Sequence, residues 1–123
     1  TNIYDEGYQL AFRIARDNLA HGLSVIADSC NAVLESRDAW QQVALDLELN
    51  YVDIEVICSD KKQHQNRVES RLADVPNLTL PSWIEVQERE YHRWKNKIAT
   101  IDTADQTIQQ SMDELFRLLA IKF

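Results

Sequence analysis

Three short apolar runs alternate with longer segments of helical periodicity along the 123 residues of this chain. The runs lie at residues 23–28, 53–58 and 98–101, contain β-branched residues, and each ends at or near an aspartate. Such alternation is typical of parallel strands joined by helical crossovers, so it predicts an α/β fold. Parallel strands are buried on both faces, which explains why these runs are continuously apolar.

The predicted helices are marked by spaced apolar residues and by local start and stop signals. The first covers residues 7–20, and Gly22 follows it where a left-handed C-terminal cap is expected. A polar helix is predicted at residues 61–73, and a capping-box pattern at Ser82 opens a helix that reaches about residue 95. We expect Trp83, Val86 and Trp94 to pack that helix. Two further helices carry apolar faces, at Trp40, Val43, Ala44 and Leu47, and at Ile108, Met112, Leu115 and Leu119.

Composition narrows the class of protein. Hydrophobic residues make up 45% of the chain, which is enough for a single compact domain over residues 1–123. The net charge of −7 argues against bulk nucleic-acid binding, which needs a basic excess. The chain has no apolar run of about 18 residues and no signal-peptide pattern, so we expect a soluble, cytoplasmic protein without membrane contact. Two cysteines and three scattered histidines predict neither a disulfide framework nor a zinc site.

Aspartates stand at the ends of all three apolar runs, at Asp28, Asp60 and Asp102. In doubly wound sheets, ligands bind beyond the carboxyl ends of the strands, so these acids are candidates for a site. Each is equally well explained as an ordinary turn or helix-cap residue. After the first run, Asn31 and Arg37 are further candidates; the plainer interpretation makes Asn31 a turn cap and Arg37 a solvated residue at a helix start.

Two arginines on the polar helix suit phosphate binding. Arg67 and Arg71 are four residues apart, so they should project from one helical face. Two guanidinium forks on one face can bind phosphate oxygens bidentately. The alternative is that Glu69 and Asp74 pair with them on a solvated helix. The chain contains no Gly-x-x-x-x-Gly-Lys-Ser/Thr loop, whose backbone amides and lysine hold the β- and γ-phosphates of a nucleotide.

Taken together, the order and spacing of these motifs resemble a family of bacterial P-loop kinase-like proteins, described as AAA-family ATP-binding proteins. Zeta toxins, gluconate kinases and polynucleotide-kinase-like domains share the architecture. The resemblance covers residues 7–119, and its main matching segments are Val25-Ile26-Ala27-Asp28, Asn31, Arg37-Asp38-Ala39-Trp40, Val56-Ile57-Cys58-Ser59-Asp60, His64, Arg67-Val68-Glu69-Ser70-Arg71, Pro81-Ser82-Trp83, Arg89-Glu90-Tyr91, Trp94 and Ile101-Asp102-Thr103-Ala104.

The resemblance implies a three-layer fold with a parallel sheet, incomplete at the N-terminus, and a lid over about residues 61–80. In the family, a strand, the P-loop with its helix, and a second strand precede the segment that matches Thr1 onward. The P-loop strand lies at the centre of the sheet. Without it, we expect a partner segment or a homo-oligomer to compensate for the missing strands.

The resemblance also implies roles for particular residues in binding ATP and Mg²⁺. Asp28 would be the Walker-B-like acid, acting on Mg²⁺ through water or on the acceptor hydroxyl. Arg67 and Arg71 would be lid arginines that close over the triphosphate and stabilise charge on the transferring phosphoryl group. The remaining assignments are Asn31 and Arg37 on the acceptor side, and Asp102 and Thr103 near the nucleotide base.

The function expected from the resemblance is phosphoryl transfer from Mg·ATP to a small-molecule or nucleotide hydroxyl. The chain alone is expected to be inactive, because positioning and neutralising the phosphates is most of the catalysis. One alternative is a non-enzymatic module that binds an anion or a partner. Another is a small α/β binding domain that resembles flavodoxin-like folds, which requires all three strands to be adjacent in one sheet.

Overall fold

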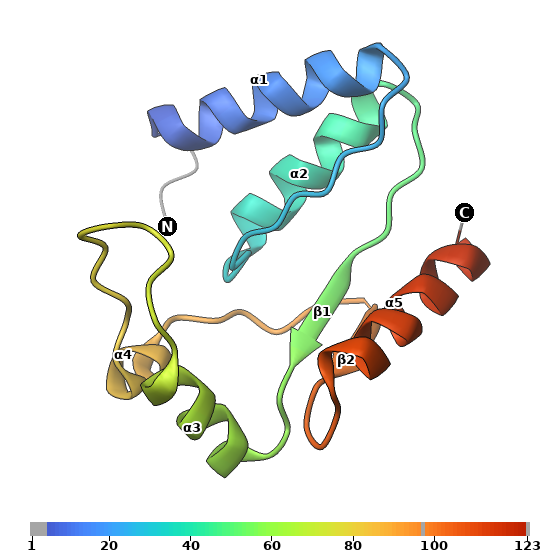
Figure 1. Cartoon of the computed structure of the whole chain (residues 1–123). Coiled ribbons are helices and arrows are strands. Elements are labelled where there is room, and N and C mark those ends of the chain that lie inside the picture. The colour runs from blue at the N-terminus through green and yellow to red at the C-terminus, as the bar shows by residue number, and fades with distance from the viewer. Residues whose placement is uncertain (1–4, 97, 123) are drawn as a thin grey trace. The chain divides into compact units, whose positions relative to one another are not determined.

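The computed structural model describes residues 5–96 and 98–122 and has a mixed α/β fold. These residues form five helices and one parallel sheet of two strands (Figure 1). The chain divides into two compact units. The helical unit comprises the described residues of Thr1–Tyr51 and Glu90–Asn96, and the sheet unit those of Val52–Arg89 and Lys97–Phe123. The elements in chain order are α1 (Glu6–Ala20), α2 (Leu34–Asp46), β1 (Ile54–Ile57), α3 (Lys61–Ser70), α4 (Trp83–Glu88), β2 (Ala99–Asp102) and α5 (Ile108–Lys122).

Helix α1 begins and ends at local sequence signals. The carboxylate of Asp5 accepts a hydrogen bond from the backbone N–H of Tyr8 at 2.8 Å, which caps the first turn. At the other end, Gly22 has a φ of 82°, in the left-handed region. The N–H of Gly22 bonds to Leu19 O at 3.0 Å and that of Leu23 to Asn18 O at 3.1 Å, which is a Schellman cap. The predicted first helix and its glycine cap are therefore confirmed.

A small hydrophobic core holds α1 against α2 (Figure 1). Val43 of α2 is 1% exposed, and Phe12 and Ala15 of α1 are also buried. The Trp40 ring meets the Phe12 ring edge-on, with 4.7 Å between their centroids. Such pairs contribute about 0.5–1.5 kcal/mol beyond their area burial. The predicted apolar face of the second helix is confirmed for Trp40 and Val43, which both pack here.

Residues 23–28 form no strand, so the first of the three predicted strands is wrong. Every residue of the segment is exposed, including Ile26 at 89%. A strand exists only through hydrogen bonds to a neighbouring strand, and the described residues provide none for this segment. Its apolar composition thus indicates a segment suited to burial but not buried in this structure.

The other two predicted strands are confirmed, and they pair in parallel. Ile54 lies opposite Ala99, and Ile57 opposite Asp102. Helix α5 packs on β2, and Ile101 at the centre of that strand is 3% exposed. Because the segment at residues 23–28 is not a strand, the three adjacent strands required by the flavodoxin-like alternative are not present among the described residues.

Helix α4 is shorter than predicted. The capping box is confirmed: Ser82 Oγ accepts from Glu85 N at 3.2 Å, and the Glu85 carboxylate accepts from Ser82 N at 3.5 Å. The helix then ends at Glu88 instead of near residue 95. Residues 90–94 form neither helix nor strand, because their backbone and side chains bond within the helical unit, which overrides their helical propensity. Trp94 therefore does not share a helix with Trp83, contrary to the prediction.

None of the described helices is both long enough and apolar enough to cross a membrane.

Candidate functional site

Thr103 joins the carboxyl ends of the two strands. Its backbone N–H and its hydroxyl both donate to Ile57 O, at 2.8 and 2.9 Å. Ile57 ends β1 and lies opposite Asp102, so these bonds extend the pairing by one residue. Thr103 is thereby fixed at the edge of a parallel sheet where ligands bind in doubly wound folds.

Arg67 reaches this edge from α3. Its Nη1 donates to Thr103 Oγ1 at 2.8 Å, and its Nη2 donates to Thr103 O at 2.9 Å. The guanidinium fork thus binds two oxygens of one residue, as it would bind two oxygens of a phosphate or carboxylate. Arg67 is exposed, so the cation is accessible to an anionic ligand.

Asp102 lies beside this pair, and its carboxylate is fixed by neighbouring amides. Oδ1 accepts from Ser59 N and from Ala104 N, both at 3.0 Å. The hydrogen bonds from the Ser59 side chain and backbone, followed by the Ala104 amide and the nearby Arg67 charge, hold the pKa of Asp102 below its ordinary value. The residue is therefore an anion near neutral pH and balances the positive charge of Arg67.

The start of α3 is tied to the turn that follows β2. Asp60 caps α3, its Oδ1 accepting from Gln63 N at 3.0 Å. The Gln63 side chain also contacts Asp105: its Oε1 accepts from Asp105 N at 2.9 Å, and its Nε2 donates to Asp105 Oδ1. The role of Asp60 as a helix cap thus explains its place after the end of β1 without a ligand. These contacts hold α3, and with it Arg67, next to Thr103.

Arg71 does not join Arg67, contrary to the prediction that both project from one helical face. Helix α3 ends at Ser70, and Arg71 has extended backbone angles, φ −69° and ψ 150°. Its Nη2 donates to Pro81 O at 2.9 Å, and the side chain lines an open groove between α3 and α4 with Val68 and Trp83. The described partners of the two arginines are accordingly Thr103 and Pro81, not the carboxylates of Glu69 and Asp74.

Asp28 belongs to the helical unit, where it is exposed at the end of the segment at residues 23–28. No group of three potential metal ligands exists among the described residues. Mg²⁺ at nucleotide sites usually needs only one or two carboxylates, because water and phosphate oxygens supply the remaining ligands. Asp28 is compatible with that need, although the described residues build no site around it.

Asn31 and Arg37 are brought together in the helical unit, but Arg37 is buried. Arg37 Nε donates to Asn31 O at 2.7 Å, and its Nη2 donates to His92 O at 2.8 Å. The guanidinium carbon lies 4.0 Å from the Trp94 ring centroid and 5.0 Å from that of Tyr91. With 3% of its surface exposed, Arg37 is not the solvated helix-start residue of the plainer prediction.

Two polar atoms of this pair have no hydrogen-bond partner among the described residues, namely Arg37 Nη1 and Asn31 Oδ1. Both atoms are buried. Leaving buried donors and acceptors unpaired is unfavourable, so one donor and one acceptor remain here for a hydroxyl or a water molecule to satisfy. An acceptor-side role for these residues would use those two atoms.

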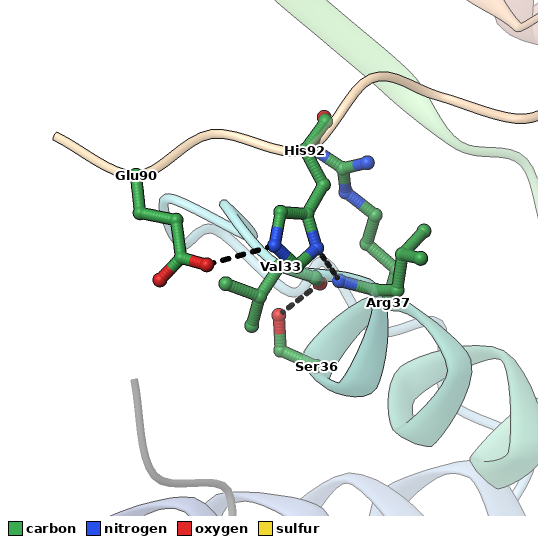
Figure 2. A network of polar contacts seen from close by, with 6 residues as sticks. Val33, Ser36, Arg37, Glu90 and His92 are labelled. Carbon is green, nitrogen blue, oxygen red and sulfur yellow. Dashed lines mark hydrogen bonds and ion pairs between the residues drawn. The ribbon is translucent and has the colours of Figure 1, made fainter.

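His92 is a structurally important residue that the sequence prediction missed. Its ring lies between the carboxylate of Glu90 and the first turn of α2 (Figure 2). The ring nitrogen Nδ1 of His92 accepts from Leu34 N at 3.0 Å, and the backbone N–H of His92 donates to Ala32 O at 2.7 Å. These bonds join positions about 60 residues apart in the sequence, and no local pattern around His92 signals them.

No protein-family model matches the chain, and no significant match to it is found among the curated proteins or the solved structures.

Proposed function

We propose that this chain is the acceptor and lid portion of a P-loop kinase-like domain that binds Mg·ATP and transfers a phosphoryl group to a small-molecule or nucleotide hydroxyl. The observation that carries this proposal is the gathering of Arg67, Asp102 and Thr103 at the carboxyl ends of two parallel strands. This edge is where nucleotide-binding α/β proteins place their ligand.

The charge and exposure of Arg67 support a contact with the triphosphate. Its fork binds two oxygens of Thr103, at 2.8 and 2.9 Å, and a guanidinium can bind two oxygens of a phosphate in the same bidentate way. In the proposed mechanism, Arg67 leaves Thr103 and binds phosphoryl oxygens, where it stabilises the charge that develops during transfer. Thr103 and Asp102 then stay at the strand ends, close to the base of the nucleotide.

The β- and γ-phosphates need a cradle of backbone amides and a lysine, and these 123 residues contain no Gly-x-x-x-x-Gly-Lys-Ser/Thr loop. The proposal therefore requires that loop to come from residues outside this sequence. Mg²⁺ bound with the nucleotide would supply neutralisation of the phosphate charge. Asp28, exposed in the helical unit, would be the carboxylate that contacts a water molecule of that ion or the acceptor hydroxyl.

The proposal is tested by titrating Mg·ATP calorimetrically into the protein encoded by the complete reading frame, and in parallel into these 123 residues alone. We expect saturable binding by the complete protein and none, or binding weaker by a factor of 100 or so, by the shorter chain. Tight binding by the 123 residues alone would show that the nucleotide site does not depend on an external loop. Absence of binding by both would favour the non-enzymatic module.

A screen for the acceptor then separates transfer from hydrolysis. The complete protein is incubated with ATP labelled at the γ-phosphate and with pools of polyols, sugars and nucleosides. Label appearing on an organic hydroxyl supports the kinase assignment. Release of inorganic phosphate that no acceptor pool alters indicates an ATPase.

A further inference from the structure

Helix α2 begins without a capping side chain of its own. Its N-cap residue is Val33, which offers no side-chain acceptor to the first turn. The first amide of the helix, Leu34 N–H, donates instead to Nδ1 of His92 at 3.0 Å. Free amides at a helix start need an acceptor, and polar caps contribute about 1 kcal/mol. His92 therefore supplies from a distant segment the cap that the helix itself lacks.

The two contacts of the His92 ring select one protonation state. Leu34 N–H can only donate, so Nδ1 must carry a lone pair. The other ring nitrogen, Nε2, lies 2.9 Å from Glu90 Oε1, and a carboxylate can only accept. The neutral ring with its proton on Nε2 satisfies both partners. A proton added to Nδ1 would point at Leu34 N–H and remove the cap.

Charged groups of both signs surround His92. Glu90, on the same segment, contacts the ring nitrogen Nε2, and this contact is partly exposed to solvent. The ring also meets the positive end of α2 through Leu34 N–H, and the buried Arg37 donates from Nη2 to His92 O at 2.8 Å. Arg93, next to His92 in the sequence, and Glu35, in the first turn of α2, are exposed, so their charges are screened.

The same segment also covers Arg37. Tyr91 and Trp94 stand on either side of His92 in the sequence, and the guanidinium of Arg37 contacts both rings. We call residues 90–94 the strap. The cap on Leu34 N–H and the shielding of Arg37 both depend on how the strap is seated, so losing one contact weakens the other.

We propose that the strap is a proton-operated latch. A proton taken from solvent onto His92 Nδ1 breaks the Leu34 N–H···Nδ1 hydrogen bond, loosens the strap at the start of α2, and exposes the Arg37 guanidinium. The latch is closed when His92 is neutral and open when it is doubly protonated. The mechanism involves only the helical unit and does not depend on nucleotide binding.

The latch is tested by ¹⁵N NMR of the purified chain as pH is lowered through the imidazole titration. At neutral pH, the ring nitrogens should report the tautomer with its proton on Nε2. As the ring protonates, protection of the Leu34 amide, corrected for intrinsic exchange, should fall roughly fivefold or more. The Arg37 Nε–H signal should broaden with the same midpoint, while the Ile101 amide in the sheet unit should not change.

The matched control is His92→Asn, because asparagine Oδ1 can accept from Leu34 N–H but cannot titrate. In that variant, Leu34 protection should be independent of pH over the same range. The latch is refuted by a proton on Nδ1 at neutral pH, or by Leu34 protection in the native chain that does not follow the His92 titration. Both of those readouts come from the unmutated protein.

Discussion

Arg67 holds Thr103 through both of its terminal nitrogens, with Nη1 2.8 Å from the hydroxyl and Nη2 2.9 Å from the carbonyl oxygen. Thr103 in turn donates its hydroxyl to Ile57 O, the last carbonyl of β1. A helix side chain, a loop and a strand end are thereby connected through one hydroxyl group. This connection determines what substitutions in the sheet unit should do.

Thr103→Val should lower the free energy of unfolding by about 1–2 kcal/mol, because valine keeps the shape of threonine but removes the hydroxyl between Arg67 and Ile57. Urea denaturation followed by circular dichroism measures the change. Thr103→Ser retains the hydroxyl and should lose clearly less. Equal stability of the valine variant and the native chain would mean that the hydroxyl contacts contribute nothing.

Acidification should remove a stabilising contribution from Asp102. Hydrogen bonds from Ser59, then from the Ala104 amide, and the charge of Arg67 lower its pKa in the folded state. A lowered pKa stabilises the fold fully above the unfolded-state pKa, and this contribution disappears as pH falls through the folded-state pKa. The stability difference between the native chain and Asp102→Asn should therefore be constant near neutral pH and vanish in acid. A carboxyl titration by NMR with a midpoint at or above that of an ordinary aspartate would contradict the assignment.

Arg37→Lys should destabilise the helical unit by about 2–3 kcal/mol, because lysine cannot reproduce the two directed hydrogen bonds and the flat stacking surface of a guanidinium. Thermal unfolding followed in the aromatic circular dichroism signal reports the change. Arg13→Lys, at an exposed position of α1, is the matched control and should change stability by less than about 0.5 kcal/mol. If Arg37 served only to contact a substrate, Arg37→Lys would unfold at the same temperature as the native chain, as the Arg13→Lys control should.

The two glycines should respond to alanine with opposite signs. Gly22 has a φ of 82°, so Gly22→Ala forces an alanine into the left-handed region and should cost about 1 kcal/mol. Gly7 lies within α1, where an added Cβ meets nothing closer than Asp5 Oδ1 at 3.4 Å. Gly7→Ala should therefore stabilise the helix by about 0.5–1 kcal/mol. This interpretation of α1 would be contradicted if both substitutions shifted the denaturation midpoint in the same direction.

Features encoded by neighbouring residues were predictable from the sequence. Asp5 and Gly22 limit α1, and the Ser82–Glu85 capping box opens α4. The start of α5 is also encoded locally: Thr107 and Gln110 exchange backbone-to-side-chain hydrogen bonds at 2.8 and 3.1 Å, a second capping box that fixes the helix start.

Features that depend on distant partners were not predictable. Residues 23–28 have the composition of a buried strand, but a strand needs a neighbour that local composition does not specify. Residues 89–95 have a helical pattern, yet the bond from His92 N to Ala32 O holds them in a non-helical conformation. For the candidate site, spacing alone suggested pairing Arg67 with Arg71, whereas the end of α3 at Ser70 separates them. The place of Arg67 beside Thr103 depends on the parallel pairing of β1 and β2.

The most direct test of the proposed nucleotide site is the affinity of the complete protein for Mg·ATP when Arg67 is replaced by glutamine. Arg117→Gln, an equal charge change at an exposed position of α5, is the control. Loss of a charge-assisted phosphate contact predicts affinity weakened roughly tenfold or more for Arg67→Gln and nearly native affinity for Arg117→Gln. Equal affinities of the native protein and the Arg67 variant would contradict the assignment of Arg67 to the triphosphate.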